Sequence, residues 1–548
     1  MMAVQLMTRQ GGWPMSVWLL PDLRPFFGGT YFPPVEAHGR SSFPSILEGL
    51  ADAYVNKRDQ IETTAGKLAD ALKELAVPDA PEEAIPVNGE WLDVLITRSI
   101  NDYDAEHGGF GAAPKFPRET LLELLLHALK SPAVSRETKQ EIERPLRHTL
   151  HAMANGGIRD QLGGAFHRYS TDSQWVVPHF EIMLYNNAML AWIYAEASRV
   201  LSEPRFAKIA RGICDFVLRE MTSPEGAFYT AYDAEVDAQE GLNYLWTMDQ
   251  LEEVLDPRQA SQFALVCGMD HGPNFADPHH GDGTPDKSVL YLAKPEREDD
   301  ETIVEMRQKL YALRQTRKKP LLDTKIITSW NALMIRGMAH VGKVTGDETY
   351  LAAALRAARF LLDHHRKPDG GLFRTSRDGK LKHDAFLDDY AFLAQSLMCL
   401  KQDDDARSLV DAMTKRFGDE ANGGFFFSDV SGTDLIARQK IASDSPLPAG
   451  NAVATLVLDR LGFNDLALGT IRAFAEQVNR HGEAMSAMLQ AMLHYIERHG
   501  PMRIEPGEAP VTDLPPEPVP VAPAIEKPAD TPAETVAEPV SYTHLTLP

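Results

Sequence analysis

Residues 156–190 have the sequence GGIRDQLGGAFHRYSTDSQWVVPHFEIMLYNNAML. A Gly-rich loop with polar and aromatic residues runs directly into an apolar helical pattern, which predicts a helix over 179–201. Pro178 precedes it, and proline is favoured at the start of a helix. The stretch therefore predicts an inward-packed helix whose first turn, together with the loop before it, carries polar side chains.

The same kind of Gly-rich loop recurs along the chain, each time at the end of a helix or helix pair. The matching loops are Gly108-Gly109-Phe110, Gly163-Gly164-Ala165-Phe166, Glu225-Gly226-Ala227-Phe228, Gly370-Gly371-Leu372-Phe373 and Gly423-Gly424-Phe425-Phe426. An insertion at about 242–327, with a short helix at 248–255 and a polar loop at 274–286, lengthens the third interval. The repeat indicates a series of helical hairpins that bury their apolar sides against neighbours.

The intervals between these loops carry apolar residues at helical spacing. The clearest predicted helices are 118–130, 136–155, 179–201, 204–221, 329–345, 348–366, 384–401, 404–417, 450–461, 465–479 and 483–498. So many hairpins can close into a ring or stack as an open solenoid whose helices end at glycine. The pattern alone leaves both arrangements open.

The ends of the chain have a different character. Residues 15–29 predict a β-hairpin, 43–75 predict a helix, and 77–87, rich in Pro, Ala and Glu, predict a linker. Beyond residue 500 the chain is rich in Pro, Ala, Val and Glu without periodicity, which predicts disorder over 500–548. Residues 540–548 match the translation of a sequencing adapter, so we expect an assembly artefact there.

Composition excludes several classes of protein. The net charge of −23 disfavours a nucleic-acid partner, and no apolar run approaches the roughly 20 residues of a membrane span. The three cysteines, Cys214, Cys267 and Cys399, form no CxxC pair, which fits a reducing compartment. The N-terminus has no signal-peptide pattern. We therefore expect a cytoplasmic protein with no nucleic-acid or membrane partner.

Longer motifs carry a family resemblance. They are GGWPMSVWLLPDLRPFFGGTYFPP, GGFGAAPKFPRE, the stretch 156–190, ITSWNALMIRG, FLDDYAFLAQSL and PLPAGNAVA. In this order they resemble the thioredoxin-domain family named after spermatogenesis-associated protein 20. The resemblance implies a mainly α protein: a partial thioredoxin-like domain at 1–76, a linker at 77–87, a six-hairpin (α/α)6 toroid like that of glycosidases and sugar epimerases at 88–499, and the tail.

The resemblance also bears on redox chemistry. The family's first domain begins upstream with a C-x-x-C motif that this chain does not contain, so we expect an N-terminally truncated chain. Trp13-Pro14 resembles the loop whose cis-proline faces that motif. Thiol–disulfide exchange needs a low-pKa thiolate and a resolving cysteine, so we expect no such activity here.

The first candidate site lies around the start of the helix predicted at 179–201. His179 and Glu181 can act as acid and base near neutral pH, and Tyr185 and Asn186 can bind a polar ligand. Arg168 and Tyr169, in the preceding loop, are candidate rim residues. The alternative is a helix-capping cluster. Two positions, Ile182 and Asn186, depart from the Lys and Asp usual in the family.

The second candidate is the acidic stretch at 233–237. Asp233, Glu235 and Asp237 alternate along a predicted hairpin loop, so their carboxylates are expected on one side. Paired carboxylates can perform glycoside-type acid/base catalysis, so we predict Asp233 and Glu235 as catalytic residues and Asp237 as a binding residue. A solvated loop or a Ca²⁺ site are alternatives, although the EF-hand Gly and distal Glu are missing. Tyr232 replaces the acid usual in the family.

Further polar residues beside aromatic ones lie at the starts of later predicted helices. Such combinations suit sugar recognition, and the alternative is helix capping. The candidate binding residues are Trp330, Asn331, Asp388, Asp389, Tyr390 and Asn451.

No cofactor or metal is predicted. His279 and His280, near Asp277, Asp282 and Asp286, are expected to be solvated rather than to bind zinc. The function expected from the resemblance is binding or conversion of a carbohydrate-type small molecule by an epimerase-, isomerase- or hydrolase-like protein. The alternative is a non-catalytic binding or regulatory protein whose intact relatives use the thioredoxin-like domain for redox sensing.

Overall fold

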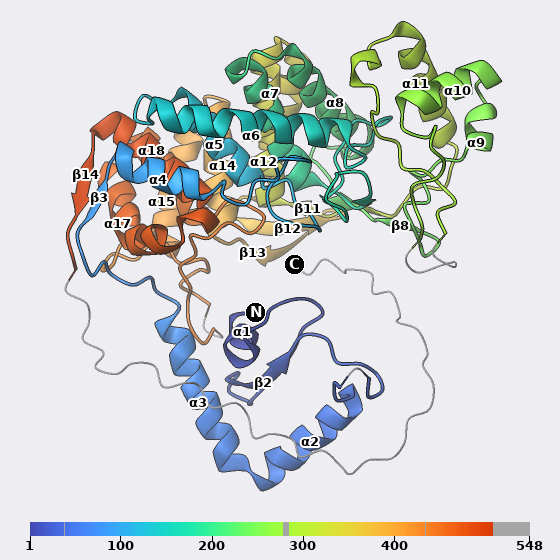
Figure 1. Ribbon diagram of the computed structural model, residues 1–548. Coiled ribbons are helices and arrows are strands. Elements are labelled where there is room, and N and C mark those ends of the chain that lie inside the picture. The colour runs from blue at the N-terminus through green and yellow to red at the C-terminus, as the bar shows by residue number, and fades with distance from the viewer. Residues whose placement is uncertain (38, 278–283, 433–434, 508–548) are drawn as a thin grey trace. The chain divides into compact units, whose positions relative to one another are not determined.

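The computed structural model describes residues 1–37, 39–277, 284–432 and 435–507, and it divides into two units (Figure 1). The N-terminal unit comprises Met1–Pro78 and Val430–Lys440, and the toroid unit comprises Asp79–Asp429 and Ile441–Gly507. Within these residues, every helix is too short or too polar to cross a lipid bilayer.

The N-terminal unit contains the predicted β-hairpin. Strands β1 (Ser16–Leu19) and β2 (Pro25–Gly29) pair antiparallel, and the Trp13–Pro14 peptide bond is cis. Leu20 and Phe26 pack against Ile61 of a following helix. The unit's helices are α1 (Met2–Thr8), α2 (Phe43–Asn56) and α3 (Arg58–Glu74).

The prediction of one helix over 43–75 is wrong in one respect, because the helix is interrupted at Lys57 and forms α2 and α3. The backbone of Lys57 leaves the helical region at φ −129°. Asn56, a weak helix former, uses its side-chain amide to bond Asp52. Near the end of the unit, the Ala76 carbonyl accepts a 2.8 Å hydrogen bond from the Lys440 amide, which joins the segment 430–440 to this unit.

The toroid unit is built on a closed ring of inner helices. Each inner helix packs on the next, and the last packs on the first. The inner helices are α5 (Glu119–Lys130), α7 (Leu184–Val200), α12 (Thr328–Thr345), α14 (Leu387–Cys399), α16 (Gly450–Leu461) and α18 (Ser486–His499). Because α18 contacts α5, the arrangement is a ring, and the open solenoid is excluded.

An outer helix covers each inner one. The pairs are α5 with α6 (Arg136–Asn155), α7 with α8 (Pro204–Glu220), α12 with α13 (Glu348–Phe360), α14 with α15 (Asp403–Phe417), α16 with α17 (Asn464–His481) and α18 with α4 (Gly89–Arg98). A π-helical turn, η2 (Leu361–His365), extends α13, and a 3-10 turn, η3 (Gly482–Ala484), precedes α18. Six inner and six outer helices confirm the predicted (α/α)6 toroid.

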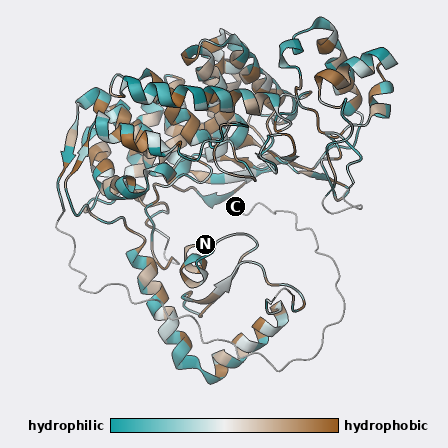
Figure 2. Ribbon diagram, in the orientation of Figure 1, coloured by the Kyte–Doolittle hydropathy of each residue, from teal (hydrophilic) through white to brown (hydrophobic). Residues whose placement is uncertain are grey.

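Burial follows from the residue pattern of each layer. Almost every residue of α7 between Leu184 and Ala197 is buried, as expected of a helix that is apolar on all sides. The outer helix α6 buries one stripe that includes Ile142, Leu146 and Leu150. Figure 2 accordingly shows α6 mostly in hydrophilic colours, with brown segments recurring along its length.

Strands in the toroid unit are short and lie mostly in the loops before inner helices. Four small antiparallel sheets form there. They pair β4 (Tyr169–Ser170) with β5 (Pro178–His179); β7 (Ala231–Tyr232) with both β6 (Ile182–Met183) and β10 (Leu322–Asp323); β8 (Glu235–Val236) with β9 (Gln239–Glu240); and β12 (Phe373–Arg377) with both β11 (Ile326–Ile327) and β13 (Lys380–Asp384).

One further pair joins residues from opposite ends of the unit. Strand β3 (Ile85–Val87) pairs with β14 (Met502–Ile504) (Figure 1). The predicted linker at 77–87 and the predicted disordered segment from 500 therefore each contribute a strand. Ile85 and Val87 are buried, which makes burial the physical reason for the pairing. Residues 508–548, including 540–548, lie outside the described part of the chain.

The insertion between α8 and α12 has its own small core. Trp246, Leu251, Phe263 and Leu310 are buried together. The helices are α9 (Met248–Glu252), α10 (Pro257–Val266), η1 (Pro295–Arg297) and α11 (Glu301–Arg314), and Figure 1 shows α9, α10 and α11 gathered together.

The recurring Gly-rich loops are held by buried asparagines of the inner helices. In α7, Asn187 accepts a hydrogen bond from the Phe166 amide (2.8 Å) and donates to the Phe166 carbonyl (2.9 Å). Asn331 of α12 makes the same two bonds to Phe228, at 2.8 and 2.9 Å. We name this pair of bonds the Asn–Phe clamp.

The clamp recurs once more and has a variant. Asn451 of α16 bonds the amide and carbonyl of Phe425 at 2.8 and 2.9 Å. In α14 the hydroxyl of Tyr390 accepts a 2.8 Å hydrogen bond from the Leu372 amide of the corresponding loop. Each contact fixes a loop to the inner helix that follows it, which explains why the loop motif repeats.

We expect Asn331→Ala to lower the free energy of unfolding of the protein by about 3 kcal/mol. The substitution leaves the buried amide and carbonyl of Phe228 unpaired, and each unpaired group costs about 1–3 kcal/mol. Urea denaturation followed by circular dichroism measures the change. Asn464→Ala, at an exposed position in α17, serves as the control. Equal stability of the two variants would contradict a structural role for the clamp.

Candidate functional site

A pocket of about 390 Å³ opens where several inner helices of the toroid begin. Residues at or just before the starts of α5, α7 and α18, with the loop before α16, form its wall. The lining residues are Phe116, Arg118, Glu119, Thr120, Arg168, Tyr185, Asn186, Asp444, Ser445, Pro446, Glu483, Ala484 and Ser486. Helix starts favour polar and anionic ligands because their first amides are unpaired.

Two carboxyl groups of the wall are protonatable near neutral pH. Burial raises the pKa of Glu119 to about 7, although Asn186 donates a hydrogen bond to its carboxylate. Burial likewise raises the pKa of Asp444 to about 6, against the amides of Ala449 and Ala487, which both lie 3.0 Å from its oxygens. A carboxyl group with a pKa near 7 can both donate and accept a proton at physiological pH.

The first predicted cluster is brought together beside the pocket. His179 Nδ1 lies 2.8 Å from Glu240 Oε1, and His179 Nε2 lies 3.8 Å from Glu181 Oε2. Glu181 also accepts a 3.0 Å hydrogen bond from Arg168, which lines the pocket. Tyr169 stacks on His179 with ring centroids 5.0 Å apart. A continuous set of polar side chains therefore leads from Glu240 to the pocket.

The local structure around His179 differs from the prediction. His179 lies in β5, Glu181 follows it, and α7 begins only at Leu184. The backbone stays extended because Ile182 and Met183 pair with Tyr232 and Ala231 of β7. Tyr185 and Asn186 do occupy the first turn of α7, as predicted.

Two polar atoms of the pocket wall have unmet hydrogen-bonding capacity. Arg168 Nε and Asn186 Oδ1 are buried, and neither has a hydrogen-bond partner in the part of the chain that the structure describes. Unpaired buried polar atoms are rare because each one costs free energy. One donor and one acceptor on the same pocket wall are therefore suited to a polar ligand.

An aromatic pair forms another part of the site. The ring of Tyr185 meets Trp330 of α12 edge to face, with centroids 4.9 Å apart. Tyr185 also acts on Arg168. Burial lowers the pKa of Arg168, but the neighbouring Tyr185 and Glu181 raise it by more, so the net change in this pKa is upward. Trp330 thus supports the pocket through Tyr185.

The predicted convergence of the carboxylates at 233–237 is wrong for Asp237, whose backbone leaves the extended conformation at φ 54°. Asp233 accepts a hydrogen bond from the Glu235 amide, and Asp237 is exposed and paired with Lys318. The hairpin itself is present as β8 and β9, and the carboxylate that reaches His179 is Glu240 in its second strand. The β8–β9 turn directs Asp237 to solvent.

Four predicted binding residues belong to the protein interior. Asn331 and Asn451 form Asn–Phe clamps, and Tyr390 makes the clamp variant. Asp389 is fully buried, and its oxygens accept hydrogen bonds from the amides of Ser329 and Phe386 and from Arg374. These side chains are satisfied by protein groups, so they hold the ring together.

Asp388 is different from its neighbour. Burial, together with the charge of Asp389, raises the pKa of Asp388 to about 7. Its carboxylate lies against the first residue of α16, where any Cβ at Gly450 would come within 2.3 Å of Asp388 Oδ1. A larger residue at 450 would therefore force the side chain of Asp388 to move.

Three important residues were not predicted from the sequence. Glu119, like Tyr185 and Asn186, lies in the first turn of an inner helix after a Gly-rich loop, and that relation could have identified it. Asp444 and Glu240 follow no pattern of this kind.

Of the other residues considered in the sequence, His279, His280 and Asp282 lie outside the described residues. Cys214 and Cys267 are buried free thiols, and Cys399 is exposed.

Comparison with known proteins identifies a matching family model and several relatives of this chain. Residues 1–73 match the family model Thioredox_DsbH, a "Protein of unknown function, DUF255". Spermatogenesis-associated protein 20 from Rattus norvegicus is 31% identical over 541 residues, covering 89% of this chain and 68% of the relative. The chain belongs to the spermatogenesis-associated protein 20 family. The human member of this family is 32% identical over 545 residues, covering 89% and 69%.

Solved structures with a similar backbone are more distant. A GH76 alpha-mannanase from Bacteroides thetaiotaomicron has a TM-score of 0.45 and 10% identity, covering 75% of this chain and 95% of the enzyme. D-mannose isomerase has a TM-score of 0.45 and 9% identity, covering 75% and 98%.

The raised pKa of Glu119 predicts a pH-dependent contribution to stability. The unfolded chain loses this proton near pH 4.5, whereas the folded protein keeps it to about pH 7. The buried carboxyl group therefore lowers the free energy of unfolding progressively as pH rises between these values. We expect Glu119→Gln to become more stable relative to the wild type over the same range, by on the order of 3 kcal/mol.

Urea denaturation at pH 5 and pH 7.5 measures this difference. Glu90→Gln, at an exposed site in α4, is the matched control and should show none. A Glu119→Gln effect that is the same at both pH values would contradict the assignment.

Proposed function

We propose that the toroid pocket binds a small carbohydrate-type molecule and transfers a proton to or from it, with Glu119 as the acid/base group. The observation that carries the proposal is the pair of unsatisfied atoms, Arg168 Nε and Asn186 Oδ1, beside this carboxyl group. A ligand with hydroxyl groups offers both the acceptor and the donor that these atoms lack.

The size and chemistry of the pocket support a small polar ligand. Its volume of about 390 Å³ lies at the lower end of the range of about 300–1,000 Å³ typical of small-molecule sites. Polar groups converge from several helix starts, while Phe116 and Tyr185 supply aromatic surface. Apolar ring faces combined with oriented hydrogen bonds suit sugars.

Each residue then has a distinct role. Glu119 exchanges the proton, and Asn186 holds its carboxyl group in place. Arg168 binds the ligand, and Glu181 orients Arg168 through their 3.0 Å hydrogen bond. His179 and Glu240 are positioning residues behind Glu181. Epimerisation, isomerisation and hydrolysis all include such a proton transfer, so the proposal covers these reaction types.

The proposal rests on the pocket and not on the toroid, because one fold hosts many unrelated functions. We place the activity in the cytoplasm, in keeping with the free thiols of Cys214, Cys267 and Cys399. Non-catalytic recognition of the same kind of molecule is the competing function, and kinetics separate the two.

A panel of aldoses, ketoses and short oligosaccharides tests the proposal. Binding is measured by saturation-transfer NMR, and conversion by proton NMR in deuterated water. We expect Glu119→Gln to keep ligand affinity within about threefold and to lower kcat at least 100-fold, the usual size of acid/base catalysis. Arg168→Ala should instead weaken binding.

His151→Ala is the control, because it removes a His–Glu contact, with Glu203, on the outer helix α6, and His151 does not line the pocket. Unchanged kcat in Glu119→Gln would refute its role. Binding without conversion by the wild type would favour the competing function.

A further inference from the structure

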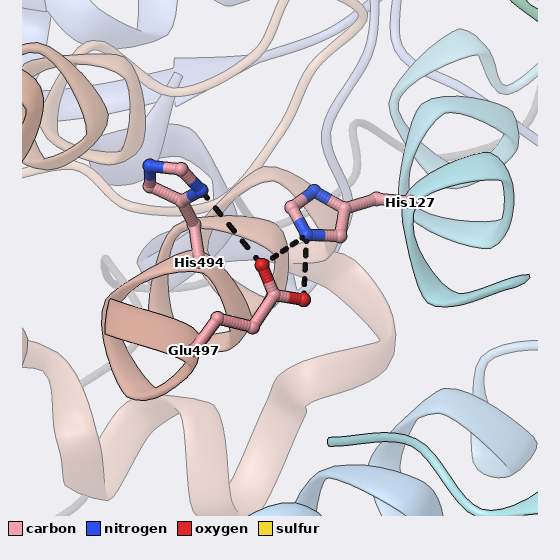
Figure 3. Close-up of side chains that lie close together, drawn as sticks. All are labelled: His127, His494 and Glu497. Carbon is pink, nitrogen blue, oxygen red and sulfur yellow. Dashed lines mark hydrogen bonds and ion pairs between the residues drawn. The ribbon is translucent and has the colours of Figure 1, made fainter. Parts of the chain in front are cut away.

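A second cluster of chemically active side chains lies toward the opposite ends of two inner helices. His127 stands in the last turn of α5, and His494 and Glu497 lie near the end of α18 (Figure 3). His127 Nε2 is 3.1 and 3.2 Å from the two oxygens of Glu497, and His494 Nδ1 is 4.0 Å from Glu497 Oε2. One possible ligand atom from each residue lies within 4.8 Å of the others.

We propose that His127, His494 and Glu497 bind a Zn²⁺ ion at the junction where the toroid closes. Two imidazoles and one carboxylate form a ligand set that zinc accepts, with water as the fourth ligand. Ligand bonds of about 2.0–2.2 Å place tetrahedral donor atoms about 3.3 Å apart. The His127–Glu497 separations of 3.1 and 3.2 Å are close to this value, whereas His494 Nδ1, 4.0 Å from Glu497 Oε2, has to move closer.

The surroundings contain groups that can support such a site. The other ring nitrogen of His494, Nε2, is 3.6 Å from Asp459 Oδ2. Among the described residues, this buried oxygen accepts no hydrogen bond. When Nδ1 of His494 binds a metal, Nε2 carries the proton, so Arg460, which donates to Nε2 at 3.3 Å, has to turn away. Asp459 Oδ2 can then accept the Nε2 proton and fix the orientation of the ring, which makes Asp459 a supporting residue.

The local charges are mixed. Arg460 Nε lies 3.3 Å from His494 Nε2, and Arg498 lies 3.4 Å from Asp459 Oδ2. Imidazole binds metals in its neutral form. The carboxylates of Glu497 and Asp459 and the C-terminal ends of both helices favour a cation.

The location gives the ion a structural role. Helices α5 and α18 are the first and last of the inner ring, and their contact closes it. The three ligand side chains are 15–18% exposed, which leaves an entry route and room for a water ligand. An ion here would link residues that are 370 positions apart in the chain and would stabilise the closed ring.

The test uses the tag-free chain of 548 residues after EDTA treatment, with ZnCl₂ as the probe. We expect one equivalent of Zn²⁺ to bind in isothermal titration calorimetry and to raise Tm, because an ion that binds only the folded state stabilises it. His127→Ala, His494→Ala and Glu497→Gln should each weaken binding at least 100-fold. Asp459→Asn should weaken it about 10- to 100-fold.

Two further measurements guard against loss of folding. Circular dichroism of each metal-free variant shows whether it is folded, and Glu497→Gln preserves the shape of the side chain. Co²⁺ should give the intense visible absorption of a tetrahedral site in the wild type and in the control His151→Ala, but not in the ligand variants. Absence of stoichiometric zinc binding, or equal binding by wild type and Glu497→Gln, would overturn the proposal.

Discussion

The hydrogen bonds of the Asn–Phe clamp hold Gly-rich loops against the starts of three inner helices of the toroid. A buried asparagine in three of the inner helices pairs with both backbone groups of a phenylalanine in the preceding Gly-rich loop. The side-chain amide pairs with a backbone N–H and a backbone C=O of the loop, as a neighbouring β-strand would. These loop groups therefore have hydrogen-bond partners without a regular sheet. Because each clamp fixes a loop beside the start of an inner helix, the loops gather at one end of the ring, and the polar residues they carry meet there.

Apolar periodicity was sufficient to predict most of the helices. The predicted bounds of α6 and α16 coincide with those observed, because their apolar residues follow helical spacing and their ends carry clear signals. Contacts between distant residues could not be predicted in this way. The pairing of β3 with β14, and the core of the insertion around Trp246 and Phe263, depend on segments whose meeting leaves no local pattern.

The same limit applied to the candidate site. Asn186 and Asn187 are neighbours of one residue type, yet one lines the pocket and the other forms a clamp. A rotation of 100° along the helix separates these roles, and the sequence does not state which side faces the ring centre. His179, Glu181 and Arg168 were identified because a Gly-rich loop concentrates polar residues, whereas Glu240 arrives from a separate hairpin.

The composition of the N-terminal unit has a consequence for biosynthesis. This unit takes its final segment from residues 430–440, which follow α15, and the bond between Lys440 and Ala76 ties that segment in place. During translation residues 1–78 therefore emerge long before the segment 430–440. The contacts between residues 1–78 and 430–440 can form only after most of the toroid has been synthesised.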